Sequence, residues 1–246
     1  MSFMVNKIYN CDCLDGLKSL PDESVDLVVT SPPYNKKFFC KQNGSNQIWG
    51  KFKIDYVSYS DDMPIDEYER WVISVINLLL QKLKPNGSIF FNHKPIRHDN
   101  QIYHPLSLIT NSKARLYQEI VWDRKNSPNI RNDILVPCTE RIFWLTKGKP
   151  TVYRDQVSKE FNSEVWNMIA EKQKKHPAPF PVQLVKNCIQ LTTKEGAIVL
   201  DPFMGSGTTA VAAKELGRNY IGFEISKEYC EIAEERVSKT VCQLSF

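Results

Sequence analysis

The fold is decided by one stretch near the C-terminus, Ala197-Ile198-Val199-Leu200-Asp201-Pro202-Phe203-Met204-Gly205-Ser206-Gly207-Thr208-Thr209. Its apolar start, residues 197–200, predicts a buried strand that runs into a glycine-rich loop. A small-residue helix is predicted over 210–216, a second strand over 220–223, and a serine-capped helix over 226–237. Strands that alternate with helices in this way predict an α/β fold with a doubly wound, mainly parallel sheet.

A strand, a glycine loop, a helix, a second strand and an acidic residue form a unit that binds nucleosides. Gly205 and Gly207 let the backbone approach a ligand, and Glu224, 17 residues after Gly207, is placed to accept from ribose hydroxyls. Asp201 at the strand end suits an amino group or an ammonium ion better than a diphosphate, and the chain has no Gly-x-x-x-x-Gly-Lys phosphate loop. A ribose joined to a cationic amino-acid portion describes S-adenosylmethionine, which we expect as the cofactor.

A second motif, Ser31-Pro32-Pro33-Tyr34, follows the apolar run 25–29, which predicts another buried strand. Two consecutive prolines cannot continue a central strand, so the chain is expected to be stiff at the strand's carboxyl end, where open α/β sheets bind ligands. The Ser31 hydroxyl and the Pro32 carbonyl offer acceptors, and Tyr34 offers a flat ring. These groups suit a planar molecule with an exocyclic amino group. The alternative is an ordinary turn with a packed tyrosine.

Together the two motifs resemble those of the amino-methylating DNA methyltransferases, and their order resembles the β class of that family. The resemblance covers roughly residues 7–91 and 138–238. It implies an S-adenosylmethionine-dependent methyltransferase (Rossmann-like) fold with a circularly permuted motif order, and methyl transfer to the exocyclic nitrogen of a base flipped out of duplex DNA. In this family Ser-Pro-Pro-Tyr usually accompanies cytosine N4 and Asp-Pro-Pro-Tyr adenine N6. Cytosine N4 is therefore expected, with adenine N6 as the alternative.

The resemblance implies roles for individual positions of this chain. The implied catalytic residues are Ser31, Pro32, Pro33 and Tyr34, with the Tyr34 ring stacked on the flipped base. The implied cofactor-binding residues are Asp12, Cys13, His176, Phe180, Asp201, Phe203, Gly205, Ser206, Gly207, Thr208 and Glu224. Among them, Asp12 is implied at the adenine, Glu224 at the ribose, and His176 and Phe180 near the methionine portion. For His176, a surface histidine is the alternative.

The rest of the chain predicts one methyltransferase domain over 1–246, with a catalytic half at 7–91 and a cofactor-binding half at 176–240. An amphipathic helix is predicted over 64–83, ended by Lys84-Pro85-Asn86-Gly87. The other predicted elements are a short strand at 7–12, a helical turn at 14–20, strands at 88–91, 116–122 and 140–146, and a helix that starts at Pro181. Residues 94–111 give no clear pattern.

Basic residues in loops predict contacts with DNA phosphates. The candidates are Lys36, Lys37, Lys41, Lys51, Lys53, Arg124 and Lys125, with a second cluster at Lys172, Lys174 and Lys175. Candidate DNA-recognition loops span 35–62, 95–135 and 150–175. Double-stranded DNA is the expected partner; a homodimer, and a cognate restriction endonuclease or second methyltransferase, are expected by analogy alone.

The composition is that of a soluble protein whose net charge of +4 suits a polyanionic partner. The seven cysteines and four histidines show no metal-ligand spacing, so no metal is expected. The sequence suggests neither a signal peptide nor a membrane span, and a cytoplasmic, nucleoid-associated bacterial protein is expected.

Three other functions stay open from the sequence. Pro137-Cys138 raises cytosine C5 methylation, in which a cysteine is the nucleophile, but Ser-Pro-Pro-Tyr has no role in that chemistry. RNA or protein-glutamine methylation uses a related Asn-Pro-Pro motif, normally placed after the glycine loop. A non-catalytic DNA-binding protein would bind the cofactor without transferring its methyl group.

Overall fold

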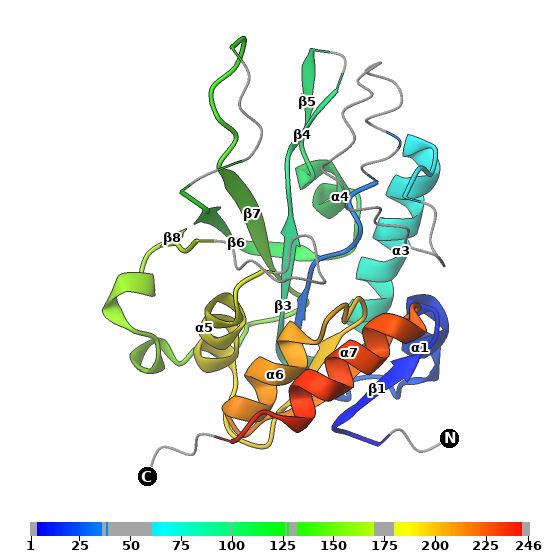
Figure 1. Ribbon diagram of the computed structural model, residues 1–246, viewed down its shortest axis with the longest axis vertical. Helices are drawn as coiled ribbons and strands as arrows, with labels where there is room; N and C mark the ends of the chain where they lie inside the picture. The colour runs from blue at the N-terminus through cyan, green and yellow to red at the C-terminus, as the bar shows by residue number, and fades with distance from the viewer. Residues whose placement is uncertain are drawn as a thin grey trace.

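An eight-stranded sheet with the order β1-β10-β9-β2-β3-β7-β6-β8 forms the centre of the computed structural model (Figure 1). The structure describes residues 4–35, 38, 61–98, 100–125, 127, 132–169 and 180–242. The strands are β1 (Lys7–Asn10), β2 (Val25–Thr30), β3 (Leu83–His93), β6 (Arg115–Asp123), β7 (Thr139–Thr146), β8 (Val165–Asn167), β9 (Ile198–Asp201) and β10 (Asn219–Glu224). The first five strands in the sheet order run parallel, β7 runs antiparallel to both of its neighbours, and β8 is parallel to β6. The predicted α/β class with a mainly parallel sheet is confirmed.

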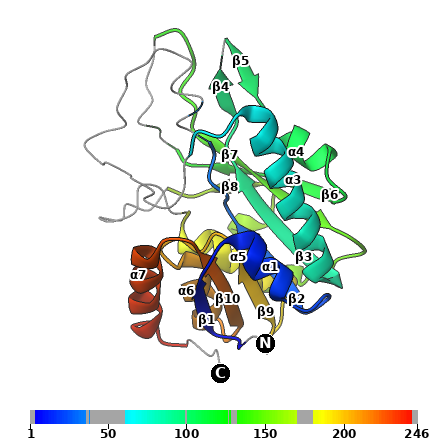
Figure 2. The ribbon, with the colours of Figure 1, turned by 90° about the vertical axis from the view of Figure 1, so that its right-hand side faces the viewer.

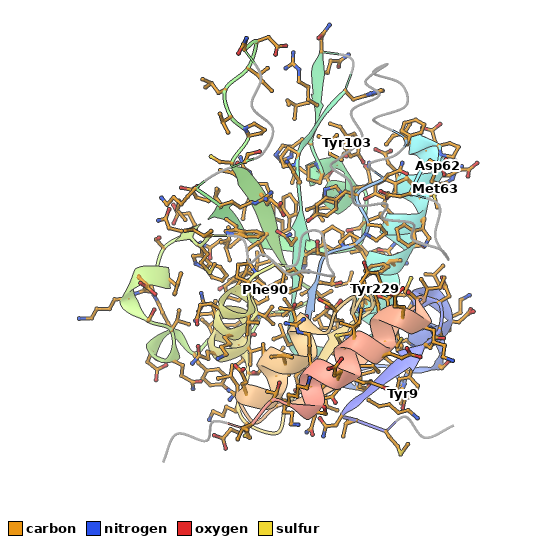
Figure 3. The ribbon with its side chains drawn as sticks, viewed as in Figure 1. Tyr9, Asp62, Met63, Phe90, Tyr103 and Tyr229 are labelled. Atoms are coloured by element: carbon orange, nitrogen blue, oxygen red, sulfur yellow. The ribbon has the colours of Figure 1, made fainter. Side chains whose placement is uncertain are left out.

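Helices cover both faces of the sheet (Figures 1 and 2). One face carries α1 (Cys13–Ser19), α3 (Ile65–Lys82) and α4 (Leu106–Thr110), and the other carries α5 (Val182–Thr192), α6 (Thr208–Glu215) and α7 (Lys227–Ser238). Side chains alternate between the two layers along each strand. Phe90, labelled in Figure 3, packs in the α5–α7 layer, while its neighbours Ile89 and Phe91 pack in the α1–α3 layer. This two-sided burial explains why the central strands are apolar without interruption.

The helix starts follow the sequence signals closely. α5 begins directly after Pro181, a residue that suits this position because it lacks the N–H that a first turn leaves unpaired. α7 begins after Ser226, whose hydroxyl accepts from the Tyr229 backbone N–H at 3.4 Å. Both predicted starts are confirmed.

Three parts of the chain differ from the prediction or show no clear pattern in the sequence. β3 starts at Leu83, so Lys84–Gly87 lies within that strand rather than in a turn, and Lys84 is ion-paired with Asp26 of β2 at 2.8 Å. The undecided region 94–111 holds the hairpin of β4 (Ile96–His98) and β5 (Gln101–Tyr103) followed by α4. The segment after residue 150 holds two short 3₁₀ turns, η1 (Arg154–Gln156) and η2 (Lys159–Phe161), and β8. Elements of three residues are too short to show a period in sequence.

Candidate active site

The carboxyl ends of β2 and β9 bring the two sequence motifs together. β2 lies parallel beside β9, with Leu27 opposite Val199. Parallel strands end at the same edge of a sheet, so the 31–34 segment after β2 and the glycine loop after β9 share that edge. A hydrogen bond joins them, since the Thr30 hydroxyl donates to Asp201 Oδ1 at 2.8 Å.

Asp201 is the buried acceptor at this junction, with only 1% of the residue exposed. It also accepts from Thr209 Oγ1 at 2.7 Å and from the Phe203 backbone N–H at 3.0 Å. Burial raises the pKa of its carboxyl from the ordinary 3.8 to about 6, against the opposing effect of the hydrogen bonds from Thr209 and Thr30. Both oxygens thus have donors within the protein, and a contact between Asp201 and the amino group of a ligand stays a prediction.

We expect Asp201 to make the protein less stable as the pH rises from about 4 to about 6. The folded carboxyl holds its proton more tightly than the unfolded one, so this destabilisation is absent at low pH and complete above pH 6. Urea unfolding of wild type and Asp201→Asn should show it, because the variant cannot ionise. Relative to the variant, wild type should lose on the order of 1 kcal/mol between pH 5 and pH 7.5. A constant difference across that range would contradict the raised pKa.

The last helix, α7, packs against the glycine loop and holds it in place. Gly207 precedes α6 with φ of 84°, and a Cβ built there would lie 2.8 Å from the Ala233 Cβ of α7. Ser206 is buried, and Arg236 of α7 donates to its carbonyl oxygen at 2.5 Å and to its hydroxyl at 3.0 Å. Thr208, the first residue of α6, is also buried. α7 therefore fixes the position of the loop that would face the cofactor.

Carboxylates at the ends of β1 and β10 fit the ribose and adenine of the expected cofactor. Glu224 accepts from the Gly205 N–H at 2.8 Å and from the Ser226 N–H at 2.9 Å, one at each oxygen, which leaves lone pairs for ribose hydroxyls. Burial raises the pKa of Glu224, and these two backbone hydrogen bonds oppose it. Asp12 lies nearby, because β1 pairs with β10 so that Asn10 is opposite Glu224. Its Oδ1 caps α1 by accepting from the Leu14 N–H at 2.8 Å.

The other expected cofactor residues have different surroundings. Cys13 is buried, and burial raises the pKa of its thiol. Phe180 is partly buried against the α5–α7 layer. The Phe203 ring lies 5.5 Å from the Trp71 ring of α3, measured between centroids. His176 lies outside the residues that the structure describes.

The Ser31–Tyr34 segment is held at several points. The Tyr68 hydroxyl donates to the Pro33 carbonyl at 2.9 Å, and the Asn35 side chain exchanges two hydrogen bonds with the Met63 backbone, at 2.7 and 2.8 Å. Tyr34 is 9% exposed, and its ring stacks on His93 with 4.5 Å between centroids. One face of the Tyr34 ring is thus covered by His93. Its stacking on a target base stays a prediction.

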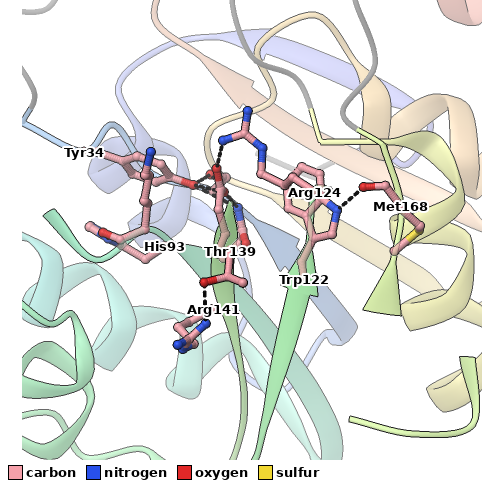
Figure 4. Close-up of polar contacts among 11 residues, drawn as sticks. Tyr34, His93, Trp122, Arg124, Thr139, Arg141 and Met168 are labelled. Atoms are coloured by element: carbon pink, nitrogen blue, oxygen red, sulfur yellow. Dashed lines mark hydrogen bonds and ion pairs between the residues drawn. The ribbon is translucent and has the colours of Figure 1, made fainter. Parts of the chain in front are cut away.

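Tyr34 belongs to a polar network that includes two residues that sequence reasoning missed, Glu140 and Asn92, and also Arg124, for which a DNA contact is expected. Glu140 Oε2 accepts from Tyr34 Oη at 3.1 Å and from Asn92 Nδ2 at 2.9 Å, and Glu140 Oε1 accepts from Arg124 Nη1 at 2.9 Å. Tyr34 and Arg124 approach this carboxylate from two sides (Figure 4). Asn92 Nδ2 also donates to Tyr34 Oη at 2.8 Å. Ser31 Oγ lies 2.8 Å from Tyr34 Oη, so the network reaches the first residue of the motif.

The sequence carries a weak signal for this network. Glu140 is a charged residue at the start of an apolar strand, and Asn92 and His93 are polar residues at the end of another. Polar side chains at the carboxyl end of a parallel strand are candidates for a site. His93 also accounts for the stacked face of Tyr34.

The basic residues expected at DNA are described only in part. Arg124 is turned inward: 16% of its side chain is exposed, it is ion-paired with Glu140, and it lies over the Trp122 ring at 5.6 Å. Its expected contact with a DNA phosphate stays a prediction. Lys125 is half exposed and ion-paired with Asp123 at 2.9 Å, and this lysine lowers the pKa of Asp123. The candidates outside the described residues are Lys36, Lys37, Lys41, Lys51, Lys53, Lys172, Lys174 and Lys175.

The described residues contain neither a candidate metal site nor a candidate membrane-spanning helix. No group of three or more His, Cys, Asp and Glu side chains is arranged to hold a metal ion in that part of the chain. None of the helices described is both long enough and apolar enough to cross a membrane.

Comparison with known proteins gives consistent matches. The sequence profile of a family described as DNA methylase matches residues 25–235. The Type II methyltransferase M.BglII of Bacillus subtilis is 32% identical over 269 residues, which cover 95% of this chain and 69% of that protein.

Two solved structures share the fold. PvuII DNA methyltransferase, described as cytosine-N4-specific, matches with a TM-score of 0.75 and 22% identity over 93% of this chain and 85% of that one. The M1.HpyAVI–SAM complex matches with a TM-score of 0.61 and 25% identity over 94% of this chain and 98% of that one. The family profile covers both motifs, 31–34 and 201–209.

Proposed function

Because the chain belongs to the DNA methylase family, we propose that it methylates the exocyclic N4 of cytosine in duplex DNA. The family itself establishes the coarser activity, that of an S-adenosylmethionine-dependent DNA methyltransferase of the amino-methylating class. Family membership confirms the resemblance drawn from the two motifs, the Rossmann-like methyltransferase fold and the expected cofactor. It also argues against cytosine C5 methylation through Cys138, since the family methylates amino groups.

The observation that carries the N4 proposal is Ser31 in the first position of the catalytic motif. The serine lies directly after Thr30, which is hydrogen-bonded to Asp201, and so stands where the catalytic and cofactor motifs meet. In this family, serine in place of aspartate usually accompanies cytosine N4. The cytosine-N4-specific PvuII enzyme, which shares the fold, supports the proposal.

When bound, S-adenosylmethionine would supply the methyl group to the exocyclic amino nitrogen, with S-adenosylhomocysteine as the product and one amino proton released to solvent after the transfer. Asp12 and Glu224 would hold its adenine and ribose ends, and the 201–208 loop would hold the remainder. An exocyclic amino nitrogen is a weak nucleophile because its lone pair is conjugated with the ring. Hydrogen bonds from its N–H groups to Ser31 Oγ and the Pro32 carbonyl would leave more of that lone pair on the nitrogen. In this scheme, positioning and electrostatics supply most of the rate.

A product analysis tests the proposal directly. Purified protein is incubated with S-adenosylmethionine and unmethylated bacterial DNA, the DNA is digested to nucleosides, and the products are separated by mass spectrometry. We expect N4-methylcytosine. N6-methyladenine would keep the fold and the chemistry and would establish the alternative base. If neither methylated base is detected although the cofactor still binds, the result would point to an RNA or protein substrate or to a non-catalytic DNA-binding protein.

The partners belong to the same proposal. The chain would act as the modification enzyme of a restriction–modification system, located with the nucleoid because its substrate is there. In such a system it would form a homodimer and act beside a cognate endonuclease or a second methyltransferase. Light scattering of the purified protein with and without DNA measures the oligomeric state.

A further inference from the structure

The hydrogen bonds around Tyr34 fix which way each proton points. A carboxylate only accepts, so in the 3.1 Å contact between Tyr34 Oη and Glu140 Oε2 the tyrosine is the donor. Burial, with a smaller effect of Glu140, raises the pKa of Tyr34 well above its ordinary value, so the phenol keeps its single proton. That proton therefore lies in the hydrogen bond to Glu140.

The direction of the neighbouring hydrogen bond, between Ser31 and Tyr34, follows from this. Ser31 Oγ and Tyr34 Oη are 2.8 Å apart, and one of them must donate. Because the tyrosine proton points to Glu140, the serine donates to the tyrosine. Ser31 Oγ then has two acceptor lone pairs, and the Asn92 amide N–H donates to one of them at 3.5 Å, which leaves the other for a ligand. Ser31 is only partly buried, so a lone pair can face a ligand.

The other hydrogen bonds to the Glu140 carboxylate also have only one possible direction. Arg124 is a donor only, and it occupies Glu140 Oε1. Asn92 must turn its NH₂ group toward Glu140 and Tyr34, because its carbonyl oxygen would meet a carboxylate there. Glu140 is 7% exposed, so water does not substitute freely for these partners.

We propose that Glu140, held by Arg124, is a positioning residue that orients the Tyr34 and Ser31 hydroxyls so that Ser31 Oγ presents only acceptor lone pairs to the amino group of the target base. The inference rests on the proposed function and deepens it. A hydroxyl left to rotate could turn its proton toward the amino nitrogen and compete for its lone pair. The Glu140 carboxylate removes that orientation, although the residue does not touch the base.

Glu140→Gln is the decisive variant, because it changes one atom and removes the acceptor that orients the Tyr34 proton. Arg124 would select the glutamine carbonyl oxygen, which turns the glutamine NH₂ toward Tyr34. The Asn92 amide must flip as well, because its NH₂ group would otherwise meet the glutamine NH₂ group. The Tyr34 proton can no longer point to position 140, so the Ser31 proton is no longer held toward Tyr34 and can turn toward the base. We expect kcat for methyl transfer from tritiated S-adenosylmethionine to unmethylated bacterial DNA to fall by about 10- to 100-fold. The KM for DNA and the Kd for S-adenosylmethionine should stay unchanged.

A double-mutant cycle separates orientation from a structural role. In a Tyr34→Phe background the relay is already broken, so Glu140→Gln should lower kcat no further. Glu119→Gln is the matched control, since it removes an ion pair with Arg141 (2.9 Å) on the same two strands, β6 and β7. It should leave kcat unchanged.

The outcomes are distinct from those of the product analysis. If wild type methylates DNA and Glu140→Gln matches it, the inference fails while the proposed function stands. Equal losses from Glu140→Gln in both backgrounds would mean that Glu140 only braces the strands, and would also overturn the inference. If wild type yields no methylated base, the proposed function itself fails.

Discussion

Replacing Ser31 with alanine is expected to lower kcat for DNA methylation by about 10²- to 10³-fold, the loss typical of removing one hydrogen-bond partner that acts in a transition state. Alanine removes the acceptor proposed for the amino group of the base. It leaves Thr30 bonded to Asp201, and the Pro33 and Asn35 contacts of the segment stay in place. Binding of S-adenosylmethionine, measured by calorimetry, should therefore be unchanged.

Thr30→Val is the informative neighbour of that variant. Thr30 is fully buried, and its hydroxyl donates to Asp201 rather than toward the target. Valine keeps the shape and leaves Asp201 Oδ1 with the Phe203 N–H as its donor, a loss of about 1–2 kcal/mol of folding stability. We expect weaker cofactor binding from Thr30→Val and slower chemistry from Ser31→Ala. If Ser31→Ala keeps the wild-type kcat, the assignment of Ser31 as the acceptor is wrong.

The sequence was sufficient where a local pattern sets the structure. Pro181 and Ser226 marked the starts of α5 and α7, and the apolar runs marked the central strands. The two motifs could be placed at one edge because each follows a strand of a parallel sheet, and this needs only the rule that ligands lie at the carboxyl ends. Both inferences depend on residues that are close in the chain.

The Glu140 network depends on strand order, which no local pattern reports. β7 lies antiparallel between β3 and β6, so the start of β7 meets the ends of its two neighbours at one edge. That arrangement brings Glu140 to Asn92 and Arg124. Arg124 resembles a surface loop cation in sequence, and only the position of β7 shows that it is paired inside the protein.

Gly207→Ala should remove most of the affinity for S-adenosylmethionine. The backbone at Gly207 has φ of 84°, a left-handed conformation that costs a residue with a Cβ about 1–2 kcal/mol. The new methyl would also lie 2.8 Å from the Ala233 Cβ, so α7 or the loop must move. With overpacking included, we expect the free energy of unfolding to fall by about 2–4 kcal/mol. Displacement of the loop that precedes α6 should weaken cofactor binding by about tenfold or more.

Gly196→Ala is the matched control for that prediction, because it shares the backbone strain but not the clash. Gly196 has φ of 77°, and a Cβ built there meets no atom within 4 Å. It lies before β9, at the edge of the sheet opposite the glycine loop. We expect Gly196→Ala to lower stability by about 1 kcal/mol and to leave cofactor affinity intact. Calorimetric titration and urea unfolding of both variants decide the matter. Equal affinity losses in the two would mean that backbone strain alone acts, and unchanged affinity in Gly207→Ala would mean that contact with α7 does not hold the loop in its binding position.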